Sequence, residues 1–358
     1  MNPIKRFLIS CLASTIFMFP AGGLVINEFM ASNAAYMSDG DGDYEDWIEL
    51  YNPGEETIYL AGYYLSDDED NPFKWQFPAG NENVAPHLYY LIWTSGKDTS
   101  DRENMVHTNF SISVKGEVLL LSAPDGTLVD MVSPVQLVQD ISYGRYGDSE
   151  DTWMFFKEPT PWGANITQAY NGIVSPPRFS HESGFYTEGF SLELAHPDAG
   201  VTLYYTLDGS VPTPETGIRY EGPVRIDSRI GEPNTISMIP TMYYGDEEGN
   251  PTTCSPRGEV FKISVVRAGA YREGYLASSP ESKTFLVDPE IQDRYPVPIV
   301  SLVTEAGNLF DDTIGIYVPG DLYENLFPEE PWPAHPANYH QRGDIWERPV
   351  HISLFEPG

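Results

Sequence analysis

Cysteine is scarce in this chain: among 358 residues there are only Cys11 and Cys254. Cys11 lies in an N-terminal segment that we expect to be removed, so Cys254 would remain alone and an intramolecular disulfide is excluded. A chain of this length can bury an adequate core without such a bond. Because Cys254 has no second cysteine at ligand spacing, a cysteine-based zinc site is excluded as well.

Basic residues are also few, with 20 lysines and arginines against 53 aspartates and glutamates, and the formal net charge is −33. An excess of this size repels nucleic acid and anionic membrane surfaces, so we expect neither as a partner. It favours solubility and the attraction of divalent cations. Two interpretations stay open, a calcium-dependent surface protein or a solvated acidic exterior without a bound ion.

A long apolar run is found only near the N-terminus. Phe7–Phe19 follows Lys5 and Arg6 and is too short for a membrane-spanning helix, which needs about 20 apolar residues. We therefore predict a signal peptide over residues 1–23 and a secreted or cell-surface protein without a transmembrane segment after cleavage. The four residues that end at Cys11 also resemble a lipoprotein cleavage box, which would make this cysteine a lipidated N-terminus.

Glycine and proline number 31 each, and aromatic residues make up 13% of the chain. Many turns between short aromatic-rich segments are typical of sandwiches or barrels. Turn signals such as Asn52-Pro53-Gly54 and Asp125-Gly126 separate β-like runs up to about residue 167. Because an antiparallel sheet must cover its apolar face, the pattern predicts a β-sandwich. The predicted strands are Leu24–Phe29, Trp47–Tyr51, Tyr59–Leu65, Leu88–Trp93 and Glu117–Ser122.

Short motifs follow one another in a fixed order over residues 24–168. They include Ile26-Asn27-Glu28, Ala31-Ser32-Asn33, Asp46-Trp47-Ile48-Glu49-Leu50-Tyr51-Asn52, Ser142-Tyr143-Gly144-Arg145 and Thr160-Pro161-Trp162-Gly163-Ala164-Asn165. This range resembles the lamin-tail domain found in many exported bacterial proteins. The family's closing motif is Thr-Pro-Gly-x-x-Asn, so Trp162 is an extra residue here. The resemblance implies an immunoglobulin-like sandwich used for adhesion or scaffolding rather than for chemistry.

Residues 169–176 are rich in glycine, proline and serine and are predicted to form a linker. A second β-rich unit follows over residues 177–288, where Thr202–Leu207 alternates in polarity and leads into an Asp208-Gly209 turn. The closing strands are expected over Phe261–Ala270 and Lys283–Val287. The stretch Tyr205–Thr213 resembles the hallmark of the C-terminal domain of chitobiases. That resemblance implies a small sandwich that accompanies catalytic domains, can touch polysaccharide and carries no catalytic residue.

Residues 289–358 change character again, with Pro298–Val303, Gly315–Val318 and Asn338–Gly343 in order. From residue 296 onward the chain resembles the opening of the CotH spore-coat kinase family. We therefore expect an all-β chain, two immunoglobulin-like β-sandwiches in tandem followed by the incomplete, β-rich start of a kinase-like domain. The sequence is interpreted as a fragment or truncated gene.

In the CotH family the metal-holding and catalytic acidic residues lie beyond this segment, so no catalytic residue is assigned. Arg342, Glu347 and Arg348 match the family's N-terminal block. They would either line a phosphate-facing edge of the complete domain or form ion pairs that brace its first strands.

The acidic loop Asp39-Gly40-Asp41-Gly42-Asp43 is the candidate metal site. Alternate carboxylates can converge on one calcium ion, and glycines permit the turn. The EF-hand signature fails, because Tyr44 and Leu50 stand where a glycine and a glutamate would be required. A looser calcium site would add Glu45 or Asp46 to Asp39, Asp41 and Asp43; a solvated turn is the alternative. No cofactor is otherwise required.

Other chemistry finds little support in the sequence. There is no G-x-S-x-G motif and no Walker loop. His335 and His340 flank a proline-rich loop and lack a third metal ligand. Tyr204, Tyr205 and Tyr220 could stack against sugars, but strand alternation places at least one of the neighbouring pair in the core.

The first hypothesis is a secreted or cell-surface modular protein whose sandwiches position a downstream CotH-like domain in scaffolding or adhesion. The second makes the chain the targeting arm of an exported phosphotransferase whose catalytic part is missing. The third is a carbohydrate-binding adhesin, with polysaccharide or other surface proteins as partners.

Overall fold

The structure is a computed structural model that describes residues 23–80, 82–99, 105–148, 152–241, 243–245, 251–253, 255–295, 297–321, 323 and 336–356. The chain divides into two compact units, residues 1–172 and 173–358. The predicted signal peptide up to residue 22, with Cys11, lies outside the described residues, and so do Cys254 and His335.

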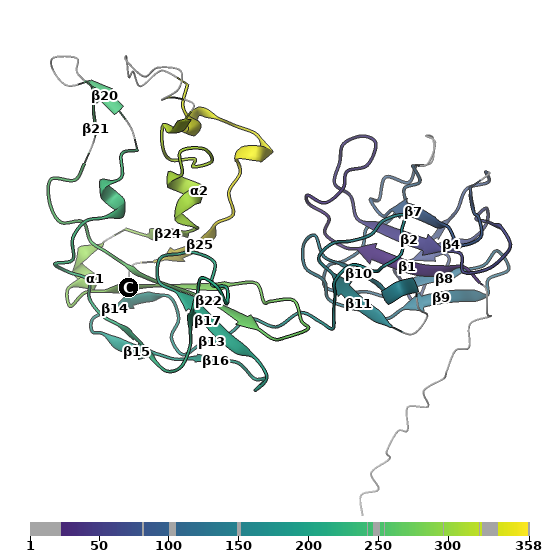
Figure 1. Ribbon diagram of the computed structural model, residues 1–358, viewed down its shortest axis with the longest axis horizontal. Helices are drawn as coiled ribbons and strands as arrows, with labels where there is room; N and C mark the ends of the chain where they lie inside the picture. The colour runs from purple at the N-terminus through teal and green to yellow at the C-terminus, as the bar shows by residue number, and fades with distance from the viewer. Residues whose placement is uncertain are drawn as a thin grey trace, which may run out of the picture. The chain divides into compact units, whose positions relative to one another are not determined.

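Unit 1 has two main sheets. One has the strand order β12-β11-β10-β1-β2-β7 and the other the order β5-β4-β8-β9, and Figure 1 shows them as two layers. The elements are β1 (Val25–Met30), β2 (Trp47–Tyr51), β3 (Ile58–Tyr59), β4 (Tyr64–Ser66), β5 (Trp75–Gln76), β6 (Asn83–Val84), β7 (Tyr89–Trp93), β8 (Leu119–Ser122), β9 (Leu128–Val132), β10 (Ser142–Arg145), η1 (Tyr146–Asp148), β11 (Trp153–Phe156) and β12 (Ala169–Tyr170).

The core of unit 1 draws aliphatic side chains from both sheets. Ile48 and Ile92 from the first sheet and Leu65 and Leu121 from the second are fully buried. β1 is buried along its whole length, and so is β2 except for its last residue, so both faces of these strands are covered. This burial explains why these strands do not alternate between apolar and polar residues.

The two sheets of unit 1 are also joined by a buried ion pair. Arg145 on β10 contacts both carboxylate oxygens of Asp130 on β9, at 2.9 and 2.8 Å. Asp130 also accepts the main-chain N–H of Ile26, and the Arg145 guanidinium donates to the Ile26 carbonyl. Four charge-assisted bonds therefore link β1, β9 and β10.

Local turn chemistry sets several strand ends. The predicted Asp125-Gly126 turn connects β8 and β9, with Gly126 at φ 87° and the Asp125 carboxylate accepting the N–H of Thr127. The predicted strand Tyr59–Leu65 is wrong as a single element. Gly62 has φ 87°, so the run breaks there into β3 and β4, which belong to different sheets.

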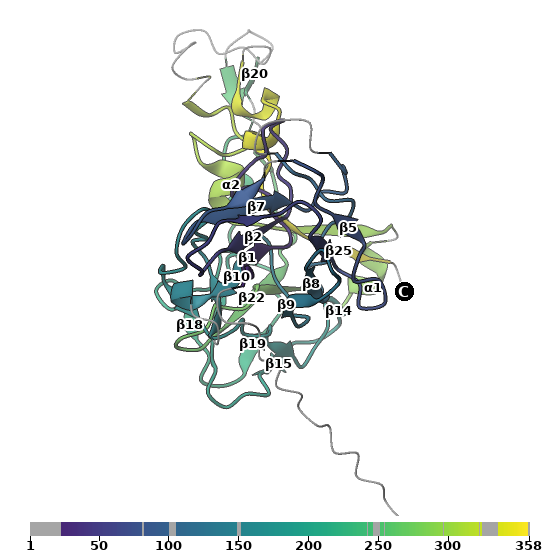
Figure 2. The same ribbon diagram turned by 90° about the vertical axis from the view of Figure 1, so that its right-hand side faces the viewer.

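Unit 2 is a second sandwich. Its largest sheet has the order β14-β23-β22-β17-β18, and β20 and β21 form a hairpin that projects away from β15 and β19 (Figures 1 and 2). The strands are β13 (Arg178–Phe179), β14 (Gly184–Tyr186), β15 (Phe190–Leu192), β16 (Leu194–Ala195), β17 (Thr202–Thr206), β18 (Ile218–Arg219), β19 (Val224–Ile226), β20 (Tyr243–Gly245), β21 (Pro251–Thr253), β22 (Ser264–Tyr271), β23 (Glu281–Val287), β24 (Ile299–Val303) and β25 (His351–Phe355). The short helices are η2 (Ile236–Met238), α1 (Ile291–Arg294), α2 (Ala306–Phe310), η3 (Asn338–His340) and η4 (Asp344–Trp346).

Several described residues after position 288 pack against the sandwich of unit 2. Phe355 of β25 joins Leu286 and Ile291 in one apolar cluster, and the hydroxyl groups of Thr284 and Ser301 lie 3.0 Å apart. The Asp208-Gly209 turn takes part in this packing, because a Cβ atom on Gly209 would lie 2.9 Å from the Thr304 carbonyl oxygen. Glycine is required there for this close approach and for its φ of 84°.

The predicted all-β class with immunoglobulin-like sandwiches is confirmed, since strands dominate both units and the helices are short. None of the helices in the described part of the chain has the length and apolar character that a bilayer crossing requires.

Candidate functional site

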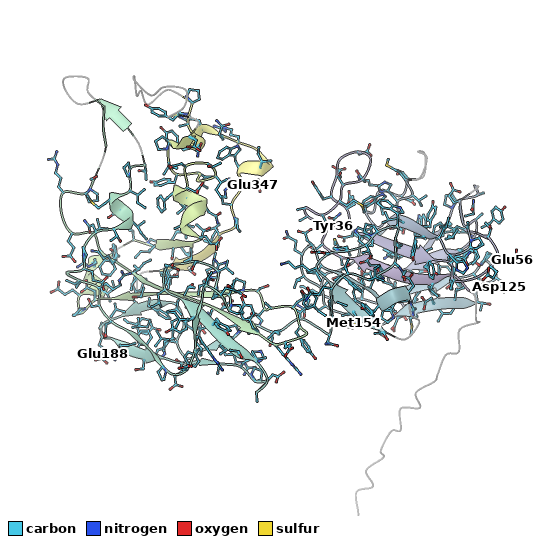
Figure 3. The ribbon with its side chains drawn as sticks, in the orientation of Figure 1. Tyr36, Glu56, Asp125, Met154, Glu188 and Glu347 are labelled. Carbon is cyan, nitrogen blue, oxygen red and sulfur yellow. The ribbon has the colours of Figure 1, made fainter. Side chains whose placement is uncertain are left out.

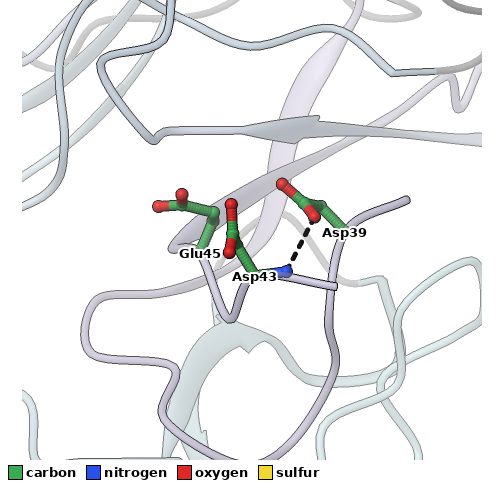
Figure 4. A group of neighbouring side chains, drawn as sticks. All are labelled: Asp39, Asp43 and Glu45. Atoms are coloured by element: carbon green, nitrogen blue, oxygen red, sulfur yellow. Dashed lines mark hydrogen bonds between the residues drawn. The ribbon is translucent and has the colours of Figure 1, made fainter. Parts of the chain in front are cut away.

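The acidic loop predicted as a metal site folds around its first carboxylate. One oxygen of Asp39 accepts the main-chain N–H groups of Asp41 and Asp43, at 2.8 and 3.0 Å, and the second of these bonds is drawn in Figure 4. Gly42, at φ 92°, allows the tight turn between them. The side chain of Asp39 is fully buried, whereas that of Asp43 is exposed.

Three of the five predicted ligands converge on a lysine. The Lys97 ammonium lies 2.6 Å from Asp39, 2.7 Å from Asp43 and 3.0 Å from Glu45. The three carboxylates lie within 4.8 Å of one another, as a cation site would require. The fit to calcium is therefore partial: the donors are suitable, but Lys97 already contacts one oxygen of each. We call these four residues the lysine cage.

Contacts within the lysine cage shift the pKa values of Asp39 and Lys97. Burial opposes the ionisation of Asp39, but the hydrogen bonds from Lys97 and from the N–H groups of Asp43 and Asp41 outweigh it, so the pKa of Asp39 lies below its ordinary value. Burial likewise opposes the charge on Lys97, yet its three carboxylate partners raise the pKa of the ammonium. Asp39 and Lys97 therefore both keep their charges at neutral pH.

The other two predicted ligands take different positions. One oxygen of Asp46 accepts the main-chain N–H groups of Ser32 and Asn33, at 2.6 and 3.2 Å, and caps the turn after β1. Asp41 is exposed and contributes its N–H to Asp39. Lys97 was not predicted as a site residue, because it lies 58 residues from Asp39 and no local pattern links the two.

A second polar site lies on the first sheet of unit 1. Glu28 on β1 and Glu49 on β2 are cross-strand partners, and both are fully buried. The register of β1 on β2 shifts between Ile26 and Glu28, so Asn27 stands in a bulge. Its side-chain amide donates to Glu49 at 3.2 Å, while its amide oxygen is buried and has no hydrogen-bond partner among the described residues.

The segment Thr160–Asn165, which we call the closing strap, is attached to these carboxylates. The main-chain N–H of Thr160 donates to Glu28 at 3.1 Å, and that of Trp162 donates to Glu49. Trp162 itself is 58% exposed and holds a φ of 63°. A left-handed backbone at an exposed tryptophan is unusual and persists here because its N–H is fixed by a buried group.

Asn165 completes the strap. Its side chain accepts a bond from the Thr160 hydroxyl at 2.6 Å and donates to the Asn27 carbonyl at 3.1 Å. Gly144 on β10 makes room for it, since a Cβ atom at that position would lie 2.6 Å from the Asn165 amide nitrogen. Motifs that are far apart in the sequence, around residues 27, 49, 144 and 160–165, therefore meet at one place.

Burial is the largest influence on the pKa values of both glutamates. It raises the pKa of Glu28 to about 7 and that of Glu49 to about 8, although hydrogen bonds from Ser142, Thr160 and Trp162 act in the opposite direction. The charge of Asp148 raises both pKa values further. Neither glutamate was predicted as a site residue, although a glutamate inside an otherwise apolar strand was a usable signal.

The three residues of the C-terminal block do not form one site. Arg348 donates to the main-chain carbonyl oxygens of Ile314, at 2.7 and 3.0 Å, and of Ile345, at 2.9 Å. Arg342 and Glu347 are exposed, and Glu347 is labelled in Figure 3. Within the described residues none of the three makes an ion pair with another.

The tyrosines of unit 2 divide between its two faces. Tyr205 and Tyr220 pack against the core, whereas Tyr204 lies edge-on to Tyr271, with ring centroids 5.5 Å apart. The expected alternation along β17 is confirmed. No sugar-stacking platform is made by these three rings together, because their faces point to different sides of the sheet.

Two parts of the chain match the models of two different domain families. Residues 19–136 match the family model of the Lamin Tail Domain, and residues 181–247 match that of the Chitobiase/beta-hexosaminidase C-terminal domain. Both predicted resemblances are confirmed. Each match covers less than half of the chain, and the first ends before Gly144 and the closing strap. The resemblance of residues 296–358 to the CotH family stays a prediction.

No curated protein matches the chain. Among solved structures, the "Sialic acid binding region of Streptococcus Sanguinis SK1 adhesin bound to 3'sLn" is 9% identical, over 75% of this chain and 78% of that chain. Its TM-score is 0.15, too low for this likeness to carry an argument. The chain is thus a tandem of immunoglobulin-like sandwiches, one similar to lamin tail domains and one to chitobiase C-terminal domains.

Proposed function

We propose that the chain is an exported modular protein, secreted or held at the cell surface, that acts in scaffolding or adhesion. Its sandwiches would carry a further folded part of the same polypeptide. The N-terminal sequence supports export, and the two family matches support the modular design. One surface in unit 2 carries the proposal.

That surface is the outer side of the β24–β25 ribbon. Val300 pairs with Leu354 across the ribbon, and Leu302 pairs with Ile352. All four side chains are between 58% and 63% exposed. The opposite side of the ribbon is half-buried or buried, and Ser301, Val303 and Phe355 are its fully covered residues. We call the four exposed residues the aliphatic face.

Two aliphatic cross-strand pairs on an open ribbon are costly in water and mark a surface that another protein layer covers. A ribbon with one side on a sandwich and the other apolar is a middle layer. We propose that its outer layer belongs to the polypeptide itself, as the remainder of the domain that residues 296–358 begin. The CotH resemblance implies a kinase-like domain there, for which this chain would serve as the scaffold.

The test is a photo-crosslinking amino acid placed at Leu302 or at Ile352 in the complete gene product, expressed in its own cells. The control position is Ile230, which is 53% exposed elsewhere in unit 2. Crosslinks from the aliphatic face to residues after 358 of the same chain are the expected result. No crosslink above the level at Ile230, or crosslinks only to other proteins, would refute the scaffold role.

Export is tested separately. The N-terminus of the protein recovered from intact cells should begin after residue 23, and added protease should degrade the protein without cell lysis. An uncleaved, protease-protected chain would contradict export. If the aliphatic face gives no crosslinks to the same chain and the protein is retained on a polysaccharide column, the adhesin alternative is favoured instead.

A further inference from the structure

The cross-strand pairing of Glu28 with Glu49 is the least expected arrangement in unit 1. Directly opposed residues on antiparallel strands have Cβ atoms about 4.5 to 5.5 Å apart, and like charges in such positions repel. Both side chains are fully buried, so water does not screen them. Two ionised carboxylates in this arrangement would need a counter-charge.

No described counter-charge contacts the pair. Its hydrogen-bond donors are neutral: the Ser142 hydroxyl at 2.5 Å from Glu28, the N–H groups of the closing strap, and the Asn27 amide. The groups that act on the pair by charge are acidic, with Asp148 on η1 facing both glutamates. The guanidinium of Arg145 on β10 is engaged with Asp130.

The remaining neighbours are tyrosines. The hydroxyl of Tyr36, which is labelled in Figure 3, donates to the Pro159 carbonyl at 2.6 Å, just before the strap. The pKa of Tyr36 is raised by burial and by the charge of Glu28. The Tyr89 hydroxyl on β7 donates to Asp148 at 2.6 Å. Neither tyrosine can supply positive charge, so protons are the cations that the described surroundings allow.

We propose that Glu28 and Glu49 form a proton-operated clasp that holds the closing strap on the sheet while the pair keeps at least one proton. When both ionise, repulsion between them and from Asp148 favours an open arrangement in which the strap leaves and water reaches the carboxylates. The closed form binds more protons than the open form, so by linkage a rise in pH favours opening. The raised pKa values of the pair place this change near neutral pH.

The closing strap lies just before the end of unit 1, so its release would affect that end. The strap is followed by β12 (Ala169–Tyr170), the last strand of unit 1, and the boundary between the units comes directly after residue 172. It also presents Trp162 on the surface. The pH around the protein would therefore control how firmly the end of unit 1, and this tryptophan, are held. This inference does not depend on the scaffold proposal.

Hydrogen exchange followed by mass spectrometry on the full chain tests the clasp. We expect the protection factor of strap amides, corrected for intrinsic exchange, to fall at least ten-fold between about pH 6 and 9. Peptides from β22 and β23 should keep theirs. The variant Glu49→Gln, a neutral mimic of the protonated acid, should stay protected at pH 9. The control Glu56→Gln, at an exposed glutamate of the same unit (Figure 3), should behave as the wild type.

Other outcomes would overturn the proposal. Strap protection that is independent of pH in the wild type excludes the clasp, and so does an equal effect of Glu49→Gln and Glu56→Gln. If millimolar calcium restores protection at pH 9 in the wild type alone, the pair binds a divalent cation and not protons. Should Glu49→Gln fail to fold, Glu28→Gln replaces it and should stay protected at pH 9. The wild type should then also show the infrared band of a protonated carboxyl at pH 6, and its absence would exclude the clasp.

Discussion

The ammonium nitrogen of Lys97 lies 2.6 Å from a carboxylate oxygen of Asp39, whose side chain is fully buried. A buried carboxylate needs a nearby positive charge or several hydrogen-bond donors, and Asp39 has both. The lysine cage therefore fixes the loop between β1 and β2 through a residue that follows β7. The sequence left calcium and a solvated turn as alternatives for this loop, and the structure places an ammonium group among three of its carboxylates.

Replacing the lysine should destabilise unit 1. In Lys97→Met, Asp39 would stay buried without its counter-charge, and we expect the free energy of unfolding to fall by about 3 kcal/mol. The control Lys115→Met removes an exposed lysine of the same unit and should cost less than about 0.5 kcal/mol. Urea denaturation of both variants measures the difference. Equal costs would show that the cage is only a surface ion pair.

Calcium should act differently on the wild type and on Lys97→Met. Removing the ammonium leaves three carboxylates within 4.8 Å of one another, a set that suits calcium. We expect millimolar calcium to raise the melting temperature of the variant by several degrees more than that of the wild type, because a ligand of the native state stabilises it by mass action. A strong wild-type response that is lost in Asp43→Asn would instead establish the calcium site.

The stabilising contribution of Asp39 to the lysine cage should be lost in acid. The pKa of Asp39 lies below its ordinary value in the folded protein, so its contribution is complete above the unfolded pKa of about 3.9 and disappears as the pH falls through the lower, folded value. The stability difference between the wild type and Asp39→Asn should therefore be constant above about pH 5 and shrink below about pH 4. Urea midpoints measured from pH 2 to 7 decide this. A difference that grows in acid contradicts the assignment.

Gly144 should tolerate no side chain. In Gly144→Ala the new methyl group would meet the Asn165 amide nitrogen at 2.6 Å and the Asn27 carbonyl at 2.9 Å. We expect a loss of about 2 kcal/mol and faster hydrogen exchange in the closing strap. Gly163→Ala, within the strap, would place its methyl group 3.6 Å from its nearest neighbour and should be nearly neutral. Comparable losses in both variants would show that the strap, rather than the contact, is sensitive.

Removing one member of the buried pair of Arg145 and Asp130 should lower the free energy of unfolding strongly, whereas replacing both members should lower it much less. Arg145→Met leaves an uncompensated carboxylate that is 1% exposed, and we expect a loss of about 3 to 5 kcal/mol. The double variant Arg145→Met with Asp130→Leu should recover at least half of that loss, because both charges are gone. A double-mutant cycle by chemical denaturation checks it. Simple additivity of the two single losses would exclude coupling.

Much of the fold followed from local patterns. Composition and turn signals predicted an all-β chain, and the strand Trp47–Tyr51 was placed at its observed bounds. The Asp125-Gly126 turn was predicted because an aspartate that accepts the N–H two residues on and a glycine at positive φ are local requirements. The ordered motifs likewise predicted both module types, which the family matches confirm.

The sites were decided by contacts between distant segments. Lys97 enters the acidic loop from 58 residues away, and the strap reaches Glu28 across 132 residues. Whether Glu28 faces Glu49 depends on one bulge at Asn27, since a shift of one residue in register turns every following side chain to the other face. The sequence by itself determined which residues carry charge and where strands can form. Only the tertiary structure decided which charges lie together, because strand pairing and burial, unlike turn chemistry, are set by residues far away in the chain.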